Sequence, residues 1–465
     1  MANKPPPILP PGNAGTLSSI TDNFAFHASP EAFLTNYARR YSQEHPHQAA
    51  RRRRPIRAQI LNRNVVIVSA YKQIFQILES QEDGKDGPAA YVAQAPYRQL
   101  MEQFFPRPNL LLAEGCLHAE MRSSWDEHAR KLQQEAVQVH ITSVTSRFFS
   151  QIALDEPFDL YNALKELSWQ LFLGTFLDLN VEDPEYAEIV RLQENLLRGQ
   201  FSLLPVSINA GFWHSPRKIG IDARKRLQKI IARRKRPRWL GEGSMDEVAV
   251  NHLLMATSSL AVKGFASLML ALLMNTFLFR KGEETVWEWM NVDTPEKGAR
   301  QQAVLRETLR LSPPIVGVMR RTTRDQTLYN AHDQEPDTLV PSGWDVWSYF
   351  AGGNRDPATF GEDAERFRPE RYLDDSSSTP SPIAFGAGTK VCLGRDFTQR
   401  AAIAVLKSFA KDDSGLYGVV SAAGVRGWLG WEVASPEKWA ADMKQLPTQR
   451  PSKPVMVSLR KRTAS

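Results

Sequence analysis

The longest apolar stretch of this chain runs from His252 to Phe279, and Lys263 is the charged residue that interrupts it. The absence of proline predicts a helix, and apolar residues on every side of a helix predict burial on every side. Such a helix needs other elements packed around it. The stretch therefore favours a large, mainly α domain with one helix through its centre. With Lys263 dividing it, no stretch approaches the roughly 18 to 20 uncharged apolar residues of a membrane-spanning helix.

Other segments repeat apolar residues at three- and four-residue spacing, which is the pattern of amphipathic helices. The predicted helices cover residues 117–135, 160–180, 184–199, 217–236, 246–279 and 297–311. Residues 56–69 are rich in β-branched side chains and predict a small strand region. Residues 312–382 alternate prolines, glycines and short apolar runs, which predicts turns, short strands and ordered loops. The expected fold class is mainly α with a small β portion.

The domain organisation follows from what the 465 residues do not contain. Neither an internal repeat nor a long Gly/Ser linker is present, so we expect a single domain over 1–465. Within it, 1–15 is a Pro-rich N-terminal segment that favours a stiff polyproline conformation. The N-terminal residues lack the apolar run of a signal peptide. We therefore expect a cytoplasmic or peripheral membrane protein with neither signal peptide nor transmembrane segment.

The net charge and its distribution indicate which classes of binding partner to expect. The net charge is +7, and basic residues cluster at Arg51 to Arg54 and within 233–238. Neither cluster lies in a nucleic-acid-binding module or alternates with aromatic residues, so we expect no nucleic-acid partner. A solvated surface is favoured, with an anionic membrane or acidic partner as the alternative. Apolar residues at 201–204 and 212–213 precede the basic helix at 217–236, so this region could contact a membrane peripherally or pack as a core loop.

The two cysteines, Cys116 and Cys392, cannot form a disulfide framework, and so few cysteines fit a reducing compartment. Any cysteine chemistry must then come from a single thiol. Cys392 lies in FGAGTKVCLG, which has the spacing F-x-x-G-x-x-x-C-x-G through Phe385, Gly388 and Gly394. With this composition, that pattern arises by chance in roughly 3 of 10,000 such chains. Cys116 is open to two interpretations, a core filler or a redox-sensitive thiol.

The chemistry of this loop suits a bound macrocycle. Glycines let the backbone pass close to a flat group, and Gly394 permits an abrupt start of the next helix, whose amides favour a thiolate. The segment resembles the haem-binding loop of the cytochrome P450 superfamily. The resemblance implies haem b as cofactor, Cys392 as catalytic thiolate and iron ligand, and Phe385, Gly388, Lys390 and Gly394 as haem-binding residues. The alternative is a buried inert cysteine in a glycine-rich turn.

A second motif of that family begins near the end of the predicted helix at 297–311. Glu307 and Arg310 form E-x-x-R on one helical face, LSPP ends the helix, and FRPERY at 367–372 resembles the family's second arginine motif. The resemblance implies a buried charge network of Glu307, Arg310 and Arg371 with a structural role, since arginine can bond a carboxylate bidentately. Exposed helix ion pairs of little energetic weight are the alternative.

Candidate propionate ligands lie elsewhere in the chain. GCLHAEMR at 115–122 resembles the family pattern G-x-x-H-x-x-x-R, and His118 and Arg122 are four residues apart, so both can face one side of a helix. The resemblance implies that they bind the haem propionates. Arg320 and Lys390 stand where the family often places further cations. Ordinary surface charge is the alternative for each.

The central helix departs from the family. Most monooxygenases of the family carry an acid or amide and then a threonine there, and this pair delivers protons during oxygen activation. The helix can be registered so that Ser259 and Leu260 take these places, or so that Gly264 and Phe265 do. Neither register supplies the pair. Hydroxyls at 257–259 could hold a substituting water, although hydroxyls in apolar helices more often bond their own backbone.

A branch of the family that lacks this pair rearranges hydroperoxides without external electrons. Residues 262–265 and 392–397 resemble its allene oxide synthase and hydroperoxide lyase members, although the loop before Cys392 lacks the insertion of the plant enzymes. We therefore expect a haem-thiolate oxidoreductase that acts on a hydrophobic small molecule or lipid, by hydroperoxide O–O cleavage or oxidative rearrangement. One alternative is an NAD(P)H- and reductase-dependent monooxygenase with a redox partner, a hydroxylase or epoxidase. Another is a non-catalytic haem sensor.

Overall fold

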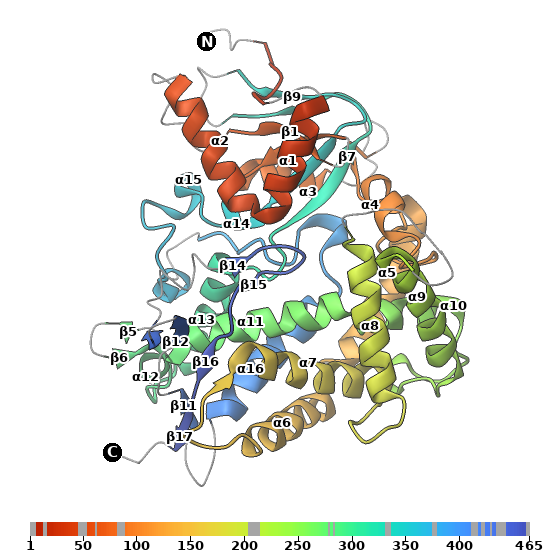
Figure 1. Cartoon of the computed structure of the whole chain (residues 1–465), viewed down its shortest axis with the longest axis vertical. Helices are drawn as coiled ribbons and strands as arrows, with labels where there is room; N and C mark the ends of the chain where they lie inside the picture. The colour runs from red at the N-terminus through yellow and green to blue at the C-terminus, as the bar shows by residue number, and fades with distance from the viewer. Residues whose placement is uncertain are drawn as a thin grey trace.

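The chain is mainly α with a small β portion, as the sequence predicts (Figure 1). The computed structural model describes residues 6–12, 16–44, 54–60, 63–80, 89–202, 214–277, 280–281, 284–330, 336–373, 379–410, 417–419, 424–427, 430–433 and 443–461. The predicted helices correspond to α5, α7, α8, α9, α10 with α11, and α13, and the predicted strand region corresponds to β1 and β2.

The helices are α1 Thr16–Ala28, α2 Pro30–Glu44, α3 Tyr71–Glu79, α4 Gln94–Met101, α5 Gly115–Lys131, α6 Glu135–Ser150, α7 Leu160–Leu177, α8 Tyr186–Gln200, α9 Pro216–Arg233, α10 Glu247–Ala256, α11 Ser259–Phe277, α12 Val286–Met290, α13 Lys297–Leu311, α14 Phe350–Gly353, α15 Pro357–Phe360 and α16 Arg395–Ala410. The short 3₁₀ helices among the described residues are η2 Arg238–Leu240, η3 Pro369–Tyr372 and η4 Gly388–Lys390.

The largest sheet has the order β1-β2-β10-β7-β3. Its strands are β1 Ile56–Ile60, β2 Arg63–Val68, β10 Asp345–Tyr349, β7 Gly317–Thr322 and β3 Tyr91–Val92. Only β2 and β10 run parallel. A second sheet, β13-β12-β16-β4, joins Gly430–Val433, Gly424–Gly427, Met456–Val457 and Phe158–Asp159. The two-stranded pairs are β11 Tyr417–Val419 with β17 Leu459–Lys461, β14 Met443–Lys444 with β15 Arg450–Pro451, β5 Arg280–Lys281 with β6 Glu284–Thr285, and β8 Gln326–Leu328 with β9 Thr338–Val340.

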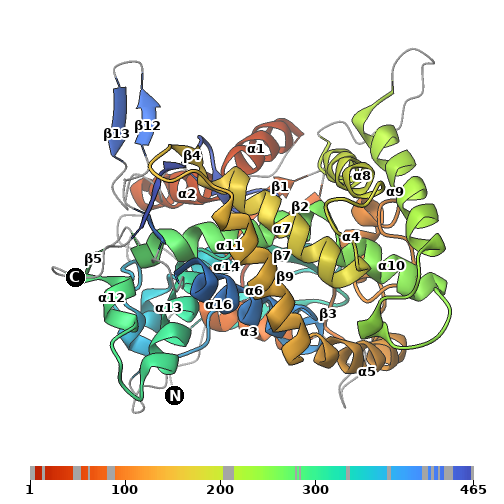
Figure 2. The same cartoon turned by 90° about the horizontal axis from the view of Figure 1, so that it is seen from below.

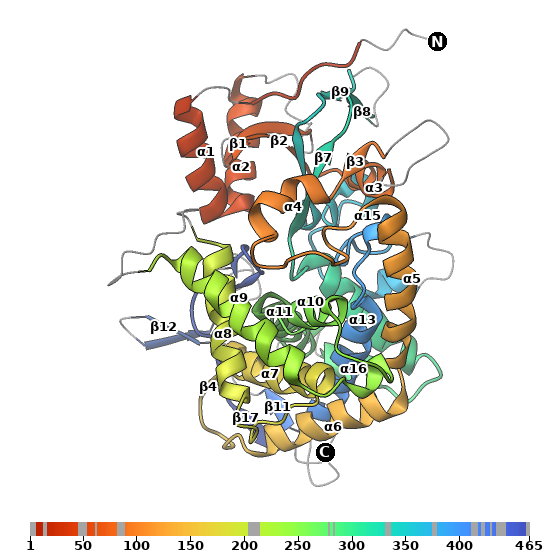
Figure 3. The same ribbon diagram turned by 90° about the vertical axis from the view of Figure 1, so that its right-hand side faces the viewer.

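The larger sheet and the helical part form two neighbouring regions. Figure 3 shows α1 and α2 against the sheet at one end, and the remaining long helices gathered around α11 at the other. Residues 6–12 follow the sheet without joining it as a strand, since Ile8 and Gly12 make isolated bridges to Thr338 and Arg57. The Pro-rich segment is thus extended where it is described.

Helix α11 is the core of the helical part. Every residue from Phe265 to Phe277 is buried, and α7, α8, α13 and α16 all pack against α11. Figure 2 shows α11 behind α7 and beside α16. Burial on all sides is what the apolar sequence predicts, since fully burying one Leu or Phe side chain stabilises the fold by about 1.5 to 3 kcal/mol.

The central helix is broken, which the sequence interpretation did not foresee. Asp246 caps the start of α10 by accepting a hydrogen bond from the Ala249 amide at 2.7 Å, and α10 ends at Ala256. Thr257 Oγ1 then donates to the Leu253 carbonyl at 2.8 Å. Ser258 Oγ accepts from the Ala261 amide at 3.2 Å, as a cap for α11. Hydroxyls that bond backbone groups interrupt an otherwise continuous helix at 257–258.

The stretch Glu247–Phe277 is long and apolar enough to cross a membrane by length and composition, although Lys263 lies within it. However, 78% of its most apolar window is buried inside the protein, as in the core helix of a globular fold. The packing of other helices around α11 is stronger evidence on the position of this stretch than its length and composition. We therefore describe this stretch as a core helix.

Candidate active site

The loop before α16 is shaped by two glycines with positive φ. Gly386 has φ +75° and Gly388 has φ +66°, conformations that favour glycine. A Cβ on Gly388 would lie 2.2 Å from the Leu78 carbonyl oxygen, so the loop passes directly against the end of α3. Gly394 differs, because a Cβ there would meet nothing closer than 3.9 Å. The backbone conformation therefore favours glycine at 386 and 388, and the Leu78 carbonyl excludes a Cβ at 388, whereas neither reason applies at 394.

Cys392 as a whole residue is exposed on this loop. The loop is closed by the Cys392 amide, which donates to the Phe385 carbonyl at 2.9 Å. Burial of the sulfur raises the pKa of the thiol, and a Gly394 backbone hydrogen bond and the charges of Arg122 and Arg395 offset part of this rise. The exposure of Cys392 contradicts the alternative of a buried inert cysteine.

Cys392 also lines a cleft of about 310 Å³ between α5 and the start of α16. Charged and polar side chains make up most of its wall, among them Arg122, Arg130, Arg395 and Asp396. Cys116, near the start of α5, is exposed as well, which excludes a core-filling role for it.

Basic side chains converge behind the Cys392 loop. Arg122 Nη1 donates to the Val391 carbonyl at 2.5 Å. Lys390 Nζ donates to the carbonyls of Leu110 and Ala113 and lies 3.7 Å from a Glu114 carboxylate oxygen.

The four predicted propionate ligands lie close enough together for their charges to shift one another's pKa values. Burial lowers the pKa of His118 to about 4, and the charges of Lys390 and Arg122 lower it further. Burial lowers the pKa of Lys390 to about 8, Glu114 raises it, and the charges of Arg320 and Arg122 lower it. Burial also lowers the pKa of Arg320, which is 4% exposed. The group therefore combines an imidazole that is neutral at pH 7 with cations in excess of the nearby Glu114.

Glu307, Arg310 and Arg371 form a buried ion-pair network. Arg310 bonds the Glu307 carboxylate bidentately, through Nε at 2.8 Å and Nη2 at 2.7 Å. Arg371 Nε adds a contact to Glu307 Oε1 at 3.1 Å, and so does the Arg368 amide at 2.8 Å. The side chains of Glu307 and Arg310 are fully buried and that of Arg371 is 3% exposed. Because all three side chains are buried, they are not the exposed helix ion pairs of the alternative interpretation.

The remaining N–H groups of Arg310 reach backbone carbonyls. Nη1 donates to Asn354 at 2.7 Å and to Ala364 at 2.5 Å, and Nη2 donates to Arg366 at 3.1 Å. Together with the two bonds to Glu307, all five N–H donors of this guanidinium have an acceptor. Arg310 thereby joins α13 to the segment that leads to η3.

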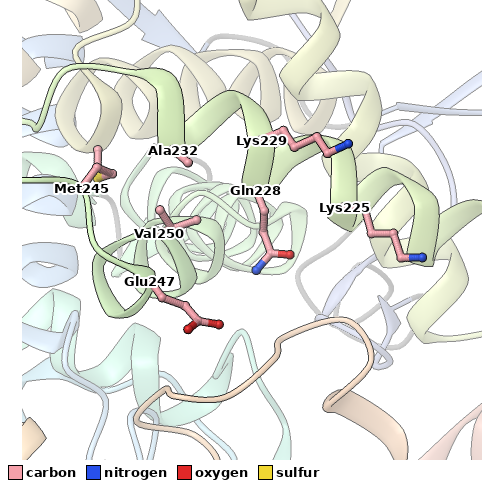
Figure 4. Close-up of a pocket in the computed structure, with 7 residues that line it drawn as sticks. All are labelled: Lys225, Gln228, Lys229, Ala232, Met245, Glu247 and Val250. Carbon is pink, nitrogen blue, oxygen red and sulfur yellow. The ribbon is translucent and has the colours of Figure 1, made fainter.

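A second cavity, of about 430 Å³, lies between α9 and α10 and includes none of the residues proposed from the sequence. Figure 4 shows Ala232 and Val250 between the two helices, with the charged end of Lys225 pointing away from Glu247. The apolar residues at 203–204 and 212–213 lie outside the described residues. Phe201 is described, at the C-terminal end of α8, and is 43% exposed.

Comparison with known proteins addresses the whole fold and the Cys392 region. The family model for cytochrome P450 matches residues 301–409, which include Glu307, Arg310, Arg371 and Cys392. A retinoic acid-bound cyanobacterial cytochrome P450 has a TM-score of 0.67 to this structure, at 16% identity, over 98% of this chain and 100% of that one. Residues 301–409 thus match the cytochrome P450 family, and the chain as a whole has the fold of cytochrome P450 structures.

Curated cytochrome P450 proteins match this chain at low identity or over a short stretch. Cytochrome P450 26A1 of Danio rerio is 24% identical over 328 residues, 62% of this chain and 63% of that protein. A bifunctional cytochrome P450/NADPH–P450 reductase of Gibberella moniliformis is 33% identical over 179 residues, 35% of this chain and 15% of that protein. The matched stretches thus span less than two thirds of these relatives.

The cytochrome P450 match over 301–409 and the cytochrome P450 fold imply haem with an axial cysteine thiolate, and the residues present fit that group. The loop offers Cys392 as an exposed residue. Haem carries two propionate carboxylates, and the nearby cations Lys390, Arg122 and Arg320 outnumber the carboxylates of Glu114 and Asp126 that pair with them. Buried cations call for such counter-charges.

Sequence reasoning missed several residues of this P450 site. Glu114 holds the turn before α5, because its Oε1 accepts from the amides of Ala93 and Gln94 at 2.8 and 2.6 Å. Tyr97 accepts from the Met319 amide at 2.9 Å, next to Arg320. No sequence pattern marked either residue, since their roles depend on contacts between segments far apart in the chain.

Proposed function

We propose that this P450 cleaves or rearranges the O–O bond of a hydroperoxide of a hydrophobic small molecule or lipid, without electrons from a reductase. One observation carries the proposal. At the break of the central helix, no acid is followed by threonine, and the hydroxyls of Thr257 and Ser258 are already engaged by backbone groups. A hydroperoxide brings its own O–O bond, so its cleavage does not need the proton pair that activates O₂.

In this proposal Cys392 would hold the iron, while His118, Arg122, Arg320 and Lys390 would bind the propionates. When bound, a haem with a thiolate ligand supplies an electron-rich iron that favours O–O cleavage. The bond from Arg122 to the Val391 carbonyl would orient the loop next to the thiol.

The role proposed for the surroundings is to exclude water. Helix α11 is apolar around most of its circumference and buried over its second half. An apolar wall favours a hydrophobic substrate, since burying its surface supplies binding energy. We include possible peripheral membrane contact in the proposal, because lipid hydroperoxides partition into membranes.

The test is to mix haem-loaded protein with a polyunsaturated fatty-acid hydroperoxide, without NAD(P)H or reductase, and to follow the conjugated-diene absorbance. Sustained loss of the diene by wild type, and none by Cys392→Ser, is the expected result. Intact haem absorbance at the end separates turnover from haem destruction. An unchanged diene with wild type would refute the hydroperoxide proposal.

A second candidate is a reductase-dependent monooxygenase, and the names of the relatives favour it. A taxane 13-alpha-hydroxylase of Taxus cuspidata is 32% identical over 139 residues, and the Gibberella moniliformis relative carries its own NADPH–P450 reductase. Product formation that requires NADPH, O₂ and a reductase would select this candidate.

A further inference from the structure

The cavity between α9 and α10 is a groove with apolar side chains along its wall. Ala232 of α9, Met245 before α10 and Val250 of α10 line it, and Val250 is 5% exposed. Its volume of about 430 Å³ lies within the range of about 300 to 1,000 Å³ that is typical of ligand pockets. The groove is therefore large enough and apolar enough to hold an alkyl chain.

Two lysines stand at one end of this groove. Lys225 and Lys229 are four residues apart on α9, so both face the same side of the helix. Figure 4 shows them toward one end of the groove and Met245 toward the other. Both lysines are exposed. Among the described residues, α9 makes its ion pairs through Lys218 and Arg226 instead, so the charges at this end of the groove are not neutralised.

A third cation beside the groove also lacks a counter-charge. Arg224 donates from Nη1 to Gln228 Oε1 at 2.8 Å, and its Nε is buried without a hydrogen-bond acceptor among the described residues. Burial lowers the pKa of Arg224, and no described carboxylate offsets this effect. Since charges that leave water ordinarily acquire a counter-charge, an anion is the group that this end of the groove lacks.

The other polar groups along the groove determine how an anion would lie. Gln228 Nε2 donates to Asn251 Oδ1 at 2.8 Å, so both polar ends of that amide are already engaged. Glu247 borders the groove in the first turn of α10, where a helix N-terminus favours negative charge. The charged end of Lys225 points away from Glu247 (Figure 4). An anionic head would therefore pair with the lysines, and an attached chain would run toward Met245.

We propose that the groove between α9 and α10 binds one molecule of an anionic amphiphile of the fatty-acid type. Its carboxylate pairs with Lys225 and Lys229, and its alkyl chain lies on the apolar residues of the wall. The inference goes beyond the proposed hydroperoxide chemistry and does not depend on it, because the groove and the Cys392 cleft share no lining residue.

The recessed position of the apolar groups favours a single molecule over a membrane surface. Helices that lie on membranes bury an apolar face that protrudes toward the lipid. Val250 lies between the two helices and is almost fully covered. Among the described residues of α9 and α10, the exposed large apolar side chain is Ile219, near the start of α9 and six positions before Lys225. A single chain can follow the apolar surface inward, whereas a bilayer surface cannot.

The test is photolabelling of the haem-loaded full chain with dodecanoic acid that carries a diazirine at its chain end, used while monomeric. Mass spectrometry of the digested protein should find the adducts on residues 239–256, which include Met245 and Val250. An exposed ion pair contributes about 1.4- to 5-fold in affinity. The double variant Lys225→Gln with Lys229→Gln should therefore raise the half-labelling concentration about 2- to 25-fold.

Two further variants test the sign and the place of the charge effect. Glu247→Gln removes a repelling carboxylate, so it should lower the half-labelling concentration by up to about fivefold. Arg226→Gln is the matched control. It removes the same charge from the same helix, but from a side chain that pairs with Glu188 of α8 at 3.0 Å. Its half-labelling concentration should change by less than about 1.4-fold.

Competition by unlabelled fatty acids tests the apolar wall. Each buried methylene contributes up to about fourfold in affinity, so decanoate should compete less well than dodecanoate by up to about 16-fold. Equal competition by the two acids would exclude an alkyl-chain site.

Two other outcomes would overturn the proposal. The site would be wrong if residues 239–256 carried no adduct, or if the double lysine variant were labelled like wild type. Vesicles that contain phosphatidylglycerol are the remaining arm of the experiment. Vesicle binding that needs Lys225 and Lys229, without labelling of the groove by the monomeric acid, would assign the lysines to a membrane surface instead.

Discussion

Replacing Arg310 by lysine should destabilise the protein severely although the charge is kept. Arg310 has five N–H donors, each with an acceptor: the two oxygens of Glu307 and the carbonyls of Asn354, Ala364 and Arg366. A lysine ammonium has three donors on one atom, so at least two of these hydrogen bonds are lost.

The magnitude follows from the hydrogen bonds that cannot be replaced. Hydrogen bonds to charged groups contribute about 1.5 to 3 kcal/mol each, so losing two costs about 3 to 6 kcal/mol. Breaking a buried ion pair costs about 3 to 5 kcal/mol, which agrees. Since a folded protein has about 5 to 15 kcal/mol of net stability, Arg310→Lys should leave little folded chain.

Urea unfolding of the protein, followed by tryptophan fluorescence, measures this loss as a change in the free energy of unfolding. Arg306→Lys is the control, because Arg306 is on the same helix but exposed and should change stability by less than about 0.5 kcal/mol. If Arg310→Lys lost less than about 1 kcal/mol, the count of indispensable donors would be wrong.

Three further outcomes test the haem-thiolate assignment and the packing of the loop before Cys392. Cys392→Ser should lose the red-shifted Soret band of the reduced carbon monoxide complex, and a persisting thiolate band would exclude Cys392 as ligand. Haem affinity, measured by titration of haem-free protein, should fall by up to about tenfold per pH unit above pH 8. The reason is that propionates raise the pKa of Lys390 above its haem-free value of about 8, so haem binding takes up a proton above this pH. Lys390→Gln should remove this pH dependence. Gly388→Ala should lower the unfolding free energy more than Gly343→Ala, because both have positive φ but only at Gly388 would the Cβ meet a backbone oxygen, that of Leu78.

The sequence predicts the elements that have a strong local signal. Apolar periodicity predicts α7, α8, α9 and α13, and the E-x-x-R and FRPERY motifs predict the residues that meet around Glu307. The sequence analysis assigns no element to α1, α2 or α6, although their amphipathic patterns are no weaker than that of α7. That Cys392 ligates iron and that His118, Arg122, Arg320 and Lys390 bind propionates stay predictions.

Contacts between segments that are far apart in the sequence could not be predicted from local patterns. Glu194 and Ser259 are 65 positions apart and meet through the packing of α8 on α11, so no local sequence pattern marks this contact. The break at Thr257 was equally hidden. An apolar run with hydroxyls is compatible with a continuous helix, and only the Leu253 and Ala261 hydrogen bonds distinguish the two.

The acceptors of Arg310 also bear on how the chain is made. Apart from Glu307, they all follow it in the sequence, 44 to 56 positions later, and Arg371 reaches Glu307 across 64 positions. A nascent chain that has just produced α13 therefore carries a guanidinium that cannot yet be buried. Domains fold as units during synthesis when their contacts are available. All acceptors of Arg310 exist only after synthesis has reached Arg366, so we expect α13 to reach its native packing late in folding.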